Sequence, residues 1–233
     1  MGGRDVDLNA VSIRADGGDE GLEDYSVASS DGSVEVVFRG IRDRLIKEIS
    51  GARYVVGCVA WLTCPDILKA LGRCNGVLIT VQKEDFLRPD TESPTAGYWR
   101  GIRKQMDTLP VIDRARFHPG LIGNLNVCCG NQGDAIRCVG NHNSERSHTH
   151  PKAHHKFVVF CDADEHRTLV PRAVWTGSFN FTRTATRSLE NAVILKDPAI
   201  VGAFFNEFQQ VYALSEPLDW ETPYSDPEYR IGT

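Results

Sequence analysis

The sequence contains no apolar run near the roughly twenty residues that a helix needs to cross a bilayer. Its first residues, Met-Gly-Gly-Arg-Asp, are polar and lack the apolar core of a signal peptide. No amphipathic basic helix, the kind that lies on anionic membranes, is evident either. These absences lead us to expect a cytoplasmic protein without stable membrane association.

Positive charge is also scarce. The chain has 26 Lys and Arg residues against 31 Asp and Glu residues, which gives a net charge of −5. A generally basic nucleic-acid-binding surface is therefore not expected. Much of the negative charge lies in residues 1–32, a segment too polar to bury much surface. We expect this segment to be an acidic, flexible arm and residues 33–233 to form one domain.

The seven cysteines include no Cys-x-x-Cys pair. They fall mostly in apolar segments, which is typical of free thiols in a reducing compartment. A zinc site from Cys128, Cys138 and His142 is an alternative, but the paired spacing of zinc ligands is missing. We expect no structural metal.

Beyond residue 33, apolar segments alternate between strand and helix periods. Strands are expected at 34–38, 54–62, 76–81, 125–128, 135–139, 157–160, 174–176 and 192–195. Helices are expected at 41–49, 67–71, 98–106 and 181–189, with a last amphipathic helix through residues 204–212. The pattern predicts an α/β fold, with a mixed, mainly parallel β-sheet flanked by helices on both faces.

His154 and Lys156 directly precede the apolar run Phe157–Phe160. On a strand, alternate side chains share a face, so His154 and Lys156 are expected to point into one pocket and His155 away from it. A neutral imidazole beside a fixed cation suits attack on a phosphate, because the ammonium offsets the charge that repels a nucleophile. The spacing therefore predicts a phosphate-handling site.

Ser178, Asn180 and Glu190 form a second candidate group. Ser178 and Asn180 precede the expected helix at 181–189, whose first N–H groups would join them in donating to phosphate oxygens. Glu190 would accept the second N–H of His154 and fix its tautomer. A nucleophile, a cation, donors and an orienting carboxylate are then all available.

The ordered set His154-x-Lys156, Gly-Ser178-x-Asn180 and Glu190-Asn resembles the motif of the phospholipase D superfamily, in which a histidine is phosphorylated during two-step phosphodiester transfer. Residues 52–71 are similar to the first strand and helix of that fold, and the likeness spans about residues 33–214. The resemblance implies a phospholipase D-like catalytic domain over residues 33–233 that needs neither cofactor nor metal. It also implies catalytic roles for His154, Lys156, Ser178, Asn180 and Glu190.

The sequence departs from the family pattern His-x-Lys-x-x-x-x-Asp at one position, where Cys161 replaces the aspartate and Asp162 follows. The family's aspartate is supporting rather than chemical, so the departure removes no residue with a catalytic role. A bulge would allow Asp162 to substitute, although a slip by one residue also turns the side chain to the other face.

The motif occurs once in the chain, whereas the superfamily builds one site from two motifs. The resemblance therefore implies a homodimer, in which two-fold symmetry places two copies of His154 on opposite sides of one phosphate. One imidazole would attack while the other protonates the leaving oxygen.

Residues 141–152 run into the motif with neither helical nor strand period, and they are expected to form a loop over the mouth of the site. Arg146 and Lys152 of this loop, together with Arg183, are the expected substrate-binding residues. The histidines of the loop could instead bind metal, an alternative that the motif's mechanism does not require.

Together these features favour a metal-independent nuclease that cuts DNA or RNA through a phosphohistidine intermediate. One alternative is a phospholipid phosphodiesterase, which would require an apolar groove for acyl chains. The other is a nucleic-acid-binding member of the fold in which Cys161 has weakened catalysis.

Overall fold

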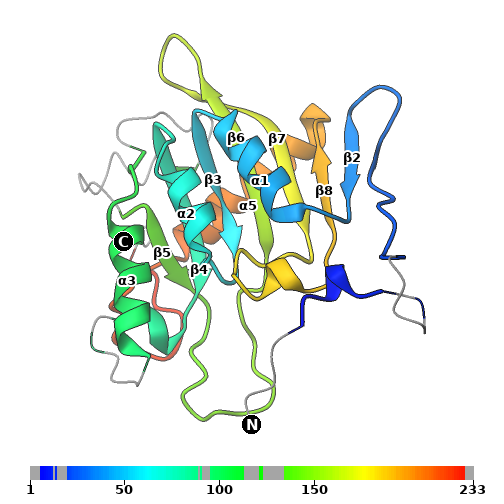
Figure 1. Cartoon of the computed structure of the whole chain (residues 1–233). Helices are drawn as coiled ribbons and strands as arrows, with labels where there is room; N and C mark the ends of the chain where they lie inside the picture. Colours follow the sequence, from blue (N-terminus) through cyan, green and yellow to red (C-terminus); the bar gives the residue numbers. More distant parts are fainter. Residues whose placement is uncertain are drawn as a thin grey trace.

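The computed structural model describes residues 6–12, 14, 20–88, 90, 95–112, 121–122 and 134–228. In these residues eight strands form one sheet in the order β1-β2-β8-β7-β6-β3-β4-β5 (Figure 1). The strands are β1 (Val27–Ala28), β2 (Val34–Val37), β3 (Tyr54–Val59), β4 (Gly76–Gln82), β5 (Ile136–Val139), β6 (Lys156–Ala163), β7 (Leu169–Gly177) and β8 (Ala192–Leu195). The helices are α1 (Ile41–Ser50), α2 (Pro65–Leu71), α3 (Ala96–Asp107) and α5 (Pro198–Ala213), with 3-10 turns η1 (Leu8–Ala10), η2 (Asp85–Leu87) and η3 (Ala185–Arg187). The expected strand at 125–128 lies outside the described residues.

The strand directions correct the expected mainly parallel sheet. Within the described sheet the β3–β4 and β4–β5 pairs are parallel, and the five remaining neighbouring pairs are antiparallel. The reason lies in the connections, because parallel neighbours require a long crossover that is usually helical. The chain passes from β6 to β7 through a short turn, and from β7 to β8 with no α-helix between them.

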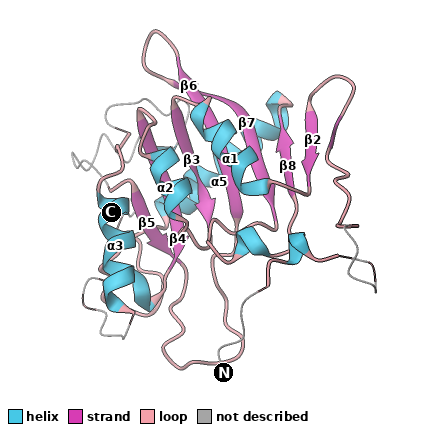
Figure 2. Cartoon of the chain, viewed as in Figure 1, coloured by secondary structure: helices cyan, strands magenta, loops and turns pink. Residues whose placement is uncertain are grey.

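Helices cover both faces of the sheet, as the sequence predicts. Helices α1 and α2 pack on one face and α5 on the other, which Figure 2 shows in front of and behind the strands. The α1–α2 face buries Leu45 and Ile67 against Trp175, while the α5 face buries Phe208 against Val159. The sheet is therefore the middle of three layers with a core on each side.

Strand β6 divides its side chains between the two cores. Val158 and Phe160 belong to the α1–α2 core, whereas Phe157, Val159 and Cys161 belong to the α5 core. Because neighbouring side chains alternate along a strand, Lys156 at the start of β6 lies on the α1–α2 face. The burial of alternate β6 side chains in the two cores thus determines which face of the sheet Lys156 lies on.

The expected helix at 181–189 does not form, and η3 is the only regular helical turn within that range. Phe179 and Phe181 are both buried, a spacing of two residues that suits extended backbone. Phe181 pairs with Leu62 in a parallel bridge, and its carbonyl accepts hydrogen bonds from the N–H groups of Thr63 and Cys64, at 2.8 and 2.9 Å. These contacts use the backbone that a helix would need.

The loop before His154 is fastened at both ends by one side chain. Gln82, fully buried at the end of β4, donates to the carbonyl of Asn141 at 2.6 Å and accepts from the N–H of Ala153 at 2.7 Å. Residues 141–155 between and beside these anchors contain no strand or helix, which confirms the expected loop. The two ends of the loop are therefore held together by Gln82.

The C-terminal residues after α5 wrap over the end of β4. Lys83, fully buried, pairs with Glu216 at 2.6 Å and donates to the carbonyls of Thr222 and Tyr224 at 3.0 and 2.5 Å. The N–H of His142 donates to the carbonyl of Pro223 at 2.8 Å. A buried ammonium with three acceptors therefore holds the C-terminal segment beside the loop that leads to His154.

Part of the N-terminal arm joins the domain. Val27 and Ala28 pair with Val36 and Glu35 of β2 as the edge strand β1. Nearer the N-terminus, Asn9 donates from its amide to the carbonyl of Ser188 at 3.1 Å. The arm thus has contacts with the sheet edge and with the β7–β8 connection.

Gly177 provides a test of how the β7–β8 approach positions the residues that follow it. Its φ is +151°, and a Cβ there would lie 2.3 Å from the carbonyl oxygen of Asn191. We expect Gly177→Ala to lower the free energy of unfolding by about 3 kcal/mol or more. As the control, Gly101→Ala on α3, where a Cβ meets nothing within 4 Å, should raise it by about 1 kcal/mol. Urea unfolding measures the free energy of unfolding of both variants. Equal effects of the two changes would contradict the close approach of Gly177 to the Asn191 carbonyl.

Candidate active site

His154 and Lys156 meet at the start of β6. The Lys156 Nζ lies 3.2 Å from Nδ1 and 3.1 Å from Nε2 of His154, and it donates to the His154 carbonyl at 2.9 Å. His155 points the other way, with its Nε2 3.7 Å from a Glu207 carboxylate oxygen on α5. The predicted orientation of these three side chains is confirmed.

Trp61 forms a wall of the site that sequence reasoning missed. Its ring meets the His154 ring edge-on, with centroids 5.6 Å apart and an interplanar angle of 80°. Its indole N–H donates to Glu84 at 2.9 Å, and the Lys152 ammonium lies 5.8 Å from its ring centre. The available signal was its position just after the buried strand β3, at the same end of the sheet as Lys156.

The electrostatic surroundings favour a neutral His154. Partial burial lowers its pKa from the usual 6.5, and the positive charges of Lys156 and Lys152 lower it further. The pKa of Lys156 is also lowered, chiefly by burial, although the Glu190 carboxylate opposes this shift. An uncharged imidazole beside an ammonium is the combination that nucleophilic attack on a phosphate requires.

Ser178 and Glu190 are bonded to each other. The Ser178 hydroxyl donates to the Glu190 carboxylate and accepts from the N–H of Asn191 at 3.0 Å. The expected bond from His154 to Glu190 is replaced by this pair, because the extended 178–190 connection brings its two ends together across the β7–β8 hairpin. The negative charge of Glu190 raises the pKa of Lys156, against the larger effect of burial.

Asn180 is half-buried on the same connection. Its side-chain oxygen is buried and has no hydrogen-bond partner among the described residues. An unmet buried acceptor costs about 1–3 kcal/mol, so such a group in a native protein calls for an explanation. The missing helix at 181–189 also means that helix-start N–H groups are not the donors beside Asn180.

The Cys161 position lies far from the chemistry. Cys161 is fully buried in the α5 core, and burial raises the pKa of its thiol far above the usual 9.0. A bulge does occur between Phe160 and Cys161, but Asp162 pairs with Arg172 at 3.0 Å near the end of α1. Lys156 and Asp162 are six positions apart on β6, which corresponds to about 20 Å of extended strand.

The expected substrate-binding residues lie in different places. Lys152 is at the site, over Trp61, whereas Arg146 is exposed in the loop, with φ +51°. Arg183 follows Asn180 by three residues and lines cavities beside α2 and α3, rather than contacting His154. The structure thus brings Lys152 close to Trp61 and His154 and leaves the two arginines on surrounding surfaces.

No group of three metal-ligating side chains occurs among the residues that the structure describes. Of the alternative zinc ligands, Cys128 lies outside them. Cys138 donates from its thiol to the carbonyl of Pro217 at 3.0 Å, and His142 pairs with Asp85 at 2.7 Å. Over the same residues, no helix has the length and apolar character of a membrane span.

The charge of Lys156 should be readable in the titration of His154. We expect His154 to titrate below 6.5, and Lys156→Met to raise its pKa, because removing a nearby positive charge favours the imidazolium. Imidazole carbon–proton NMR spectra recorded against pH measure the shift. Lys69→Met, an exposed lysine on α2, is the matched control and should leave it in place. An unchanged or lower pKa in Lys156→Met would contradict the coupling.

Two sequence comparisons found proteins similar to this chain. A family model described as cardiolipin synthase, PLD-like domain, matches residues 103–212, the range that holds all five candidate catalytic residues. The uncharacterised protein L381 of Acanthamoeba polyphaga mimivirus is 32% identical over 210 residues, covering 85% of this chain and 71% of its own.

Two solved structures resemble the fold. NucT from Helicobacter pylori has a TM-score of 0.49 at 14% identity, covering 79% of this chain and 98% of its own. Nuc from Salmonella typhimurium, described as a phospholipase D family member, has a TM-score of 0.45 at 20% identity, covering 79% of this chain and 96% of its own. The family model and the ordered motif from His154 to Glu190 place the chain in the phospholipase D superfamily.

Proposed function

We propose that the protein is a metal-independent phosphodiesterase, and specifically a nuclease. The observation that carries the proposal is the Lys156 ammonium within 3.2 Å of both ring nitrogens of His154, whose pKa is lowered. The imidazole is a nucleophile at neutral pH, and the ammonium offsets the negative charge of the phosphate it attacks. Membership of a superfamily that transfers phosphodiesters supports this chemistry.

The reaction takes place in two steps. A nitrogen of His154 attacks phosphorus, a P–O bond breaks, and the leaving oxygen takes a proton from an acid on the opposite side. In the second step water attacks the phosphohistidine and gives a proton to the same group, which is now a base; the P–N bond breaks, the phosphate product leaves and the imidazole is restored. Lys156 contacts the phosphate oxygens in both steps, and Asn180 donates to them from its amide.

The acid comes from a second copy of the chain. One chain carries one His-x-Lys motif, so a two-fold homodimer supplies the second His154 across the phosphate. The unmet acceptor of Asn180 supports a site that is completed by another molecule. In the dimer one His154 is the nucleophile and the other is the general acid.

Nucleic acid is the proposed substrate because the cations near the site suit a repeating polyanion. Lys152 lies over Trp61, Arg146 projects from the loop, and Arg183 lies beyond Asn180. Such contacts bind successive phosphates. The name of the family model includes cardiolipin synthase, so phospholipid is the substrate to compare.

His154→Ala should lower the rate of cleavage of plasmid, oligonucleotide and RNA at least a thousandfold, because the nucleophile is removed. His155→Ala is the matched control, since His155 points toward α5, and it should keep wild-type turnover. Assays run in excess EDTA should retain full activity, because no step uses a divalent ion. Equal activity of the two variants, or loss in EDTA restored by magnesium, would sink the mechanism. Cleavage of anionic phospholipid vesicles in place of nucleic acid would overturn the substrate.

Mixing experiments test the shared site. After subunit exchange at equal amounts, wild-type protein mixed with His154→Ala should lose about half of its activity, because mixed dimers contain one nucleophile and no acid. Wild-type protein mixed with His155→Ala, the control, should show the sum of the separate activities. Full activity in a sample that sediments as a monomer would rule out the dimeric mechanism.

A further inference from the structure

A cavity of about 750 Å³ opens between α3 and the β7–β8 connection. Its lining combines exposed aromatic rings with arginines. The lining residues are Val6, Leu8, Thr63, Tyr98, Trp99, Thr182, Arg183, Thr184, Arg187 and Ser188. The volume is that of a pocket able to enclose one to two nucleotides or a ligand of drug size.

The cavity begins where the active site ends. Thr63 follows Trp61 by two residues, and Thr182 follows Asn180 by two residues. The Thr63 N–H donates to the carbonyl of Phe181 at 2.8 Å, so the two segments run side by side. Extended chain rises about 3.3 Å per residue, which puts the cavity wall about 7 Å further along both segments. A polymer held at His154 therefore reaches this cavity with its next units.

The aromatic side of the cavity presents a free ring. Trp99 is stacked on Phe86 with centroids 4.3 Å apart, and Tyr98 lies across the Trp99 edge at 4.8 Å. Tyr98 itself is 44% exposed. A fixed, exposed ring backed by packed aromatics costs little entropy when a flat ligand stacks on it.

The opposite side is cationic. Arg183 and Arg187 line the cavity, and neither forms an ion pair with a carboxylate in the described part of the chain. No Asp or Glu is among the cavity's described lining residues. Two guanidinium groups without carboxylate partners, in the same cavity as an exposed ring, suit a ligand that alternates phosphate and base.

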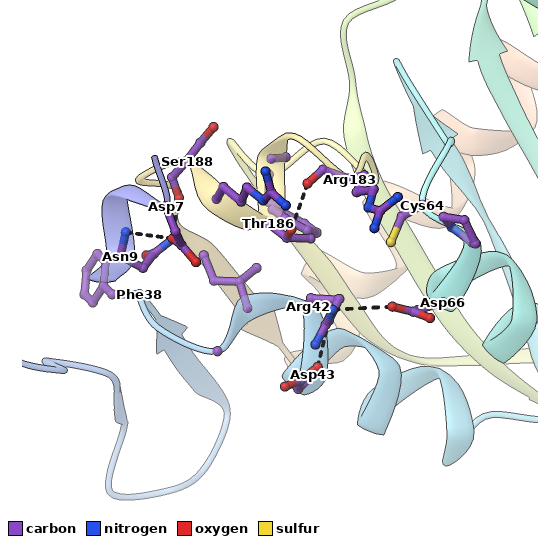
Figure 3. A pocket seen from close by; sticks show the side chains of 16 residues that line it. Asp7, Asn9, Phe38, Arg42, Asp43, Cys64, Asp66, Arg183, Thr186 and Ser188 are labelled. Carbon is purple, nitrogen blue, oxygen red and sulfur yellow. Dashed lines mark hydrogen bonds and ion pairs between the residues drawn. The ribbon is translucent and has the colours of Figure 1, made fainter. Parts of the chain in front are cut away.

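The neighbouring cavity in Figure 3 shows the contrast. It has a volume of about 610 Å³, and its lining includes Asp7, Asp43 and Asp66. Arg42 in that cavity is already paired with Asp43 at 2.8 Å and with Asp66 at 3.4 Å. Arg183 and Arg187 line this cavity as well, but here they share the lining with three aspartates, whereas no carboxylate is among the described residues that line the cavity beside α3.

We propose that the cavity bounded by Tyr98, Arg183 and Arg187 is a subsite for single-stranded nucleic acid, with an unpaired base on Tyr98 and the adjoining phosphates on the two arginines. The proposal rests on the proposed function, to which it adds a preference for single-stranded over double-stranded substrates. Bases inside a duplex are stacked on each other and do not reach Tyr98. Discrimination between single and double strands then arises beside the active site, not at the nucleophile.

Binding measured without turnover tests the subsite separately from catalysis. The probe is a fluorescein-labelled single strand of about twenty nucleotides, titrated by fluorescence anisotropy with His154→Ala protein, which leaves the probe intact. In this His154→Ala background, Tyr98→Ala and Arg187→Ala should each weaken binding about tenfold. Tyr98→Phe should bind as tightly as the parent, because stacking needs the ring alone. The same sequence as a duplex should bind about tenfold more weakly than the single strand.

The controls are Tyr25→Ala, a tyrosine in the arm that is more exposed than Tyr98, and Arg53→Ala, an arginine just before the other end of β3. Both should bind the probe within about twofold of the parent. Loss of binding in the controls as large as in Tyr98→Ala, or duplex bound as tightly as single strand, would overturn the subsite. Binding as predicted with no cleavage by wild-type protein would instead count against the proposed function alone.

Discussion

The burial of β6 on both of its faces is the constraint on which the site depends. Neighbouring residues of this strand enter different cores, so a rotation of the strand would expose one set and bury the polar residues before it. Lys156 is the first residue of β6, and His154, two residues earlier, lies beside it. Burial of Phe157, Val158 and Val159 in the two cores therefore fixes the face on which Lys156 lies beside His154.

Local patterns were enough to predict the parts of the fold that depend on neighbours in sequence. The helix at 41–49 and the strand at 76–81 appear within one residue of their expected ends, because each buries a periodic apolar face. The shared direction of His154 and Lys156 followed from the same alternation. The catalytic set itself came from resemblance to a family motif, which local pattern alone does not provide.

What the sequence could not supply depends on contacts between distant segments. The helix predicted at 181–189 had suitable spacing, but Phe181 pairs with Leu62, more than a hundred residues earlier. That pairing keeps the connection extended and allows Ser178 to meet Glu190. Strand direction was likewise wrong because apolar runs look alike whether a parallel or an antiparallel neighbour covers them. Trp61 showed no polar signal, and its place beside His154 emerges only when β3 pairs with β6.

The side chain of Gln82 holds both ends of the loop before His154, so a change in the loop and a change at His154 are independent of each other. Insertions or substitutions between Asn141 and Ala153 alter the surface that a substrate meets, while the amide bonds of Gln82 return the chain to the same point before His154. His154 and Lys156 can then keep their positions while the sequence of the loop changes. A fold that holds both ends of a surface loop through one buried side chain can change the loop without moving the residues that follow it.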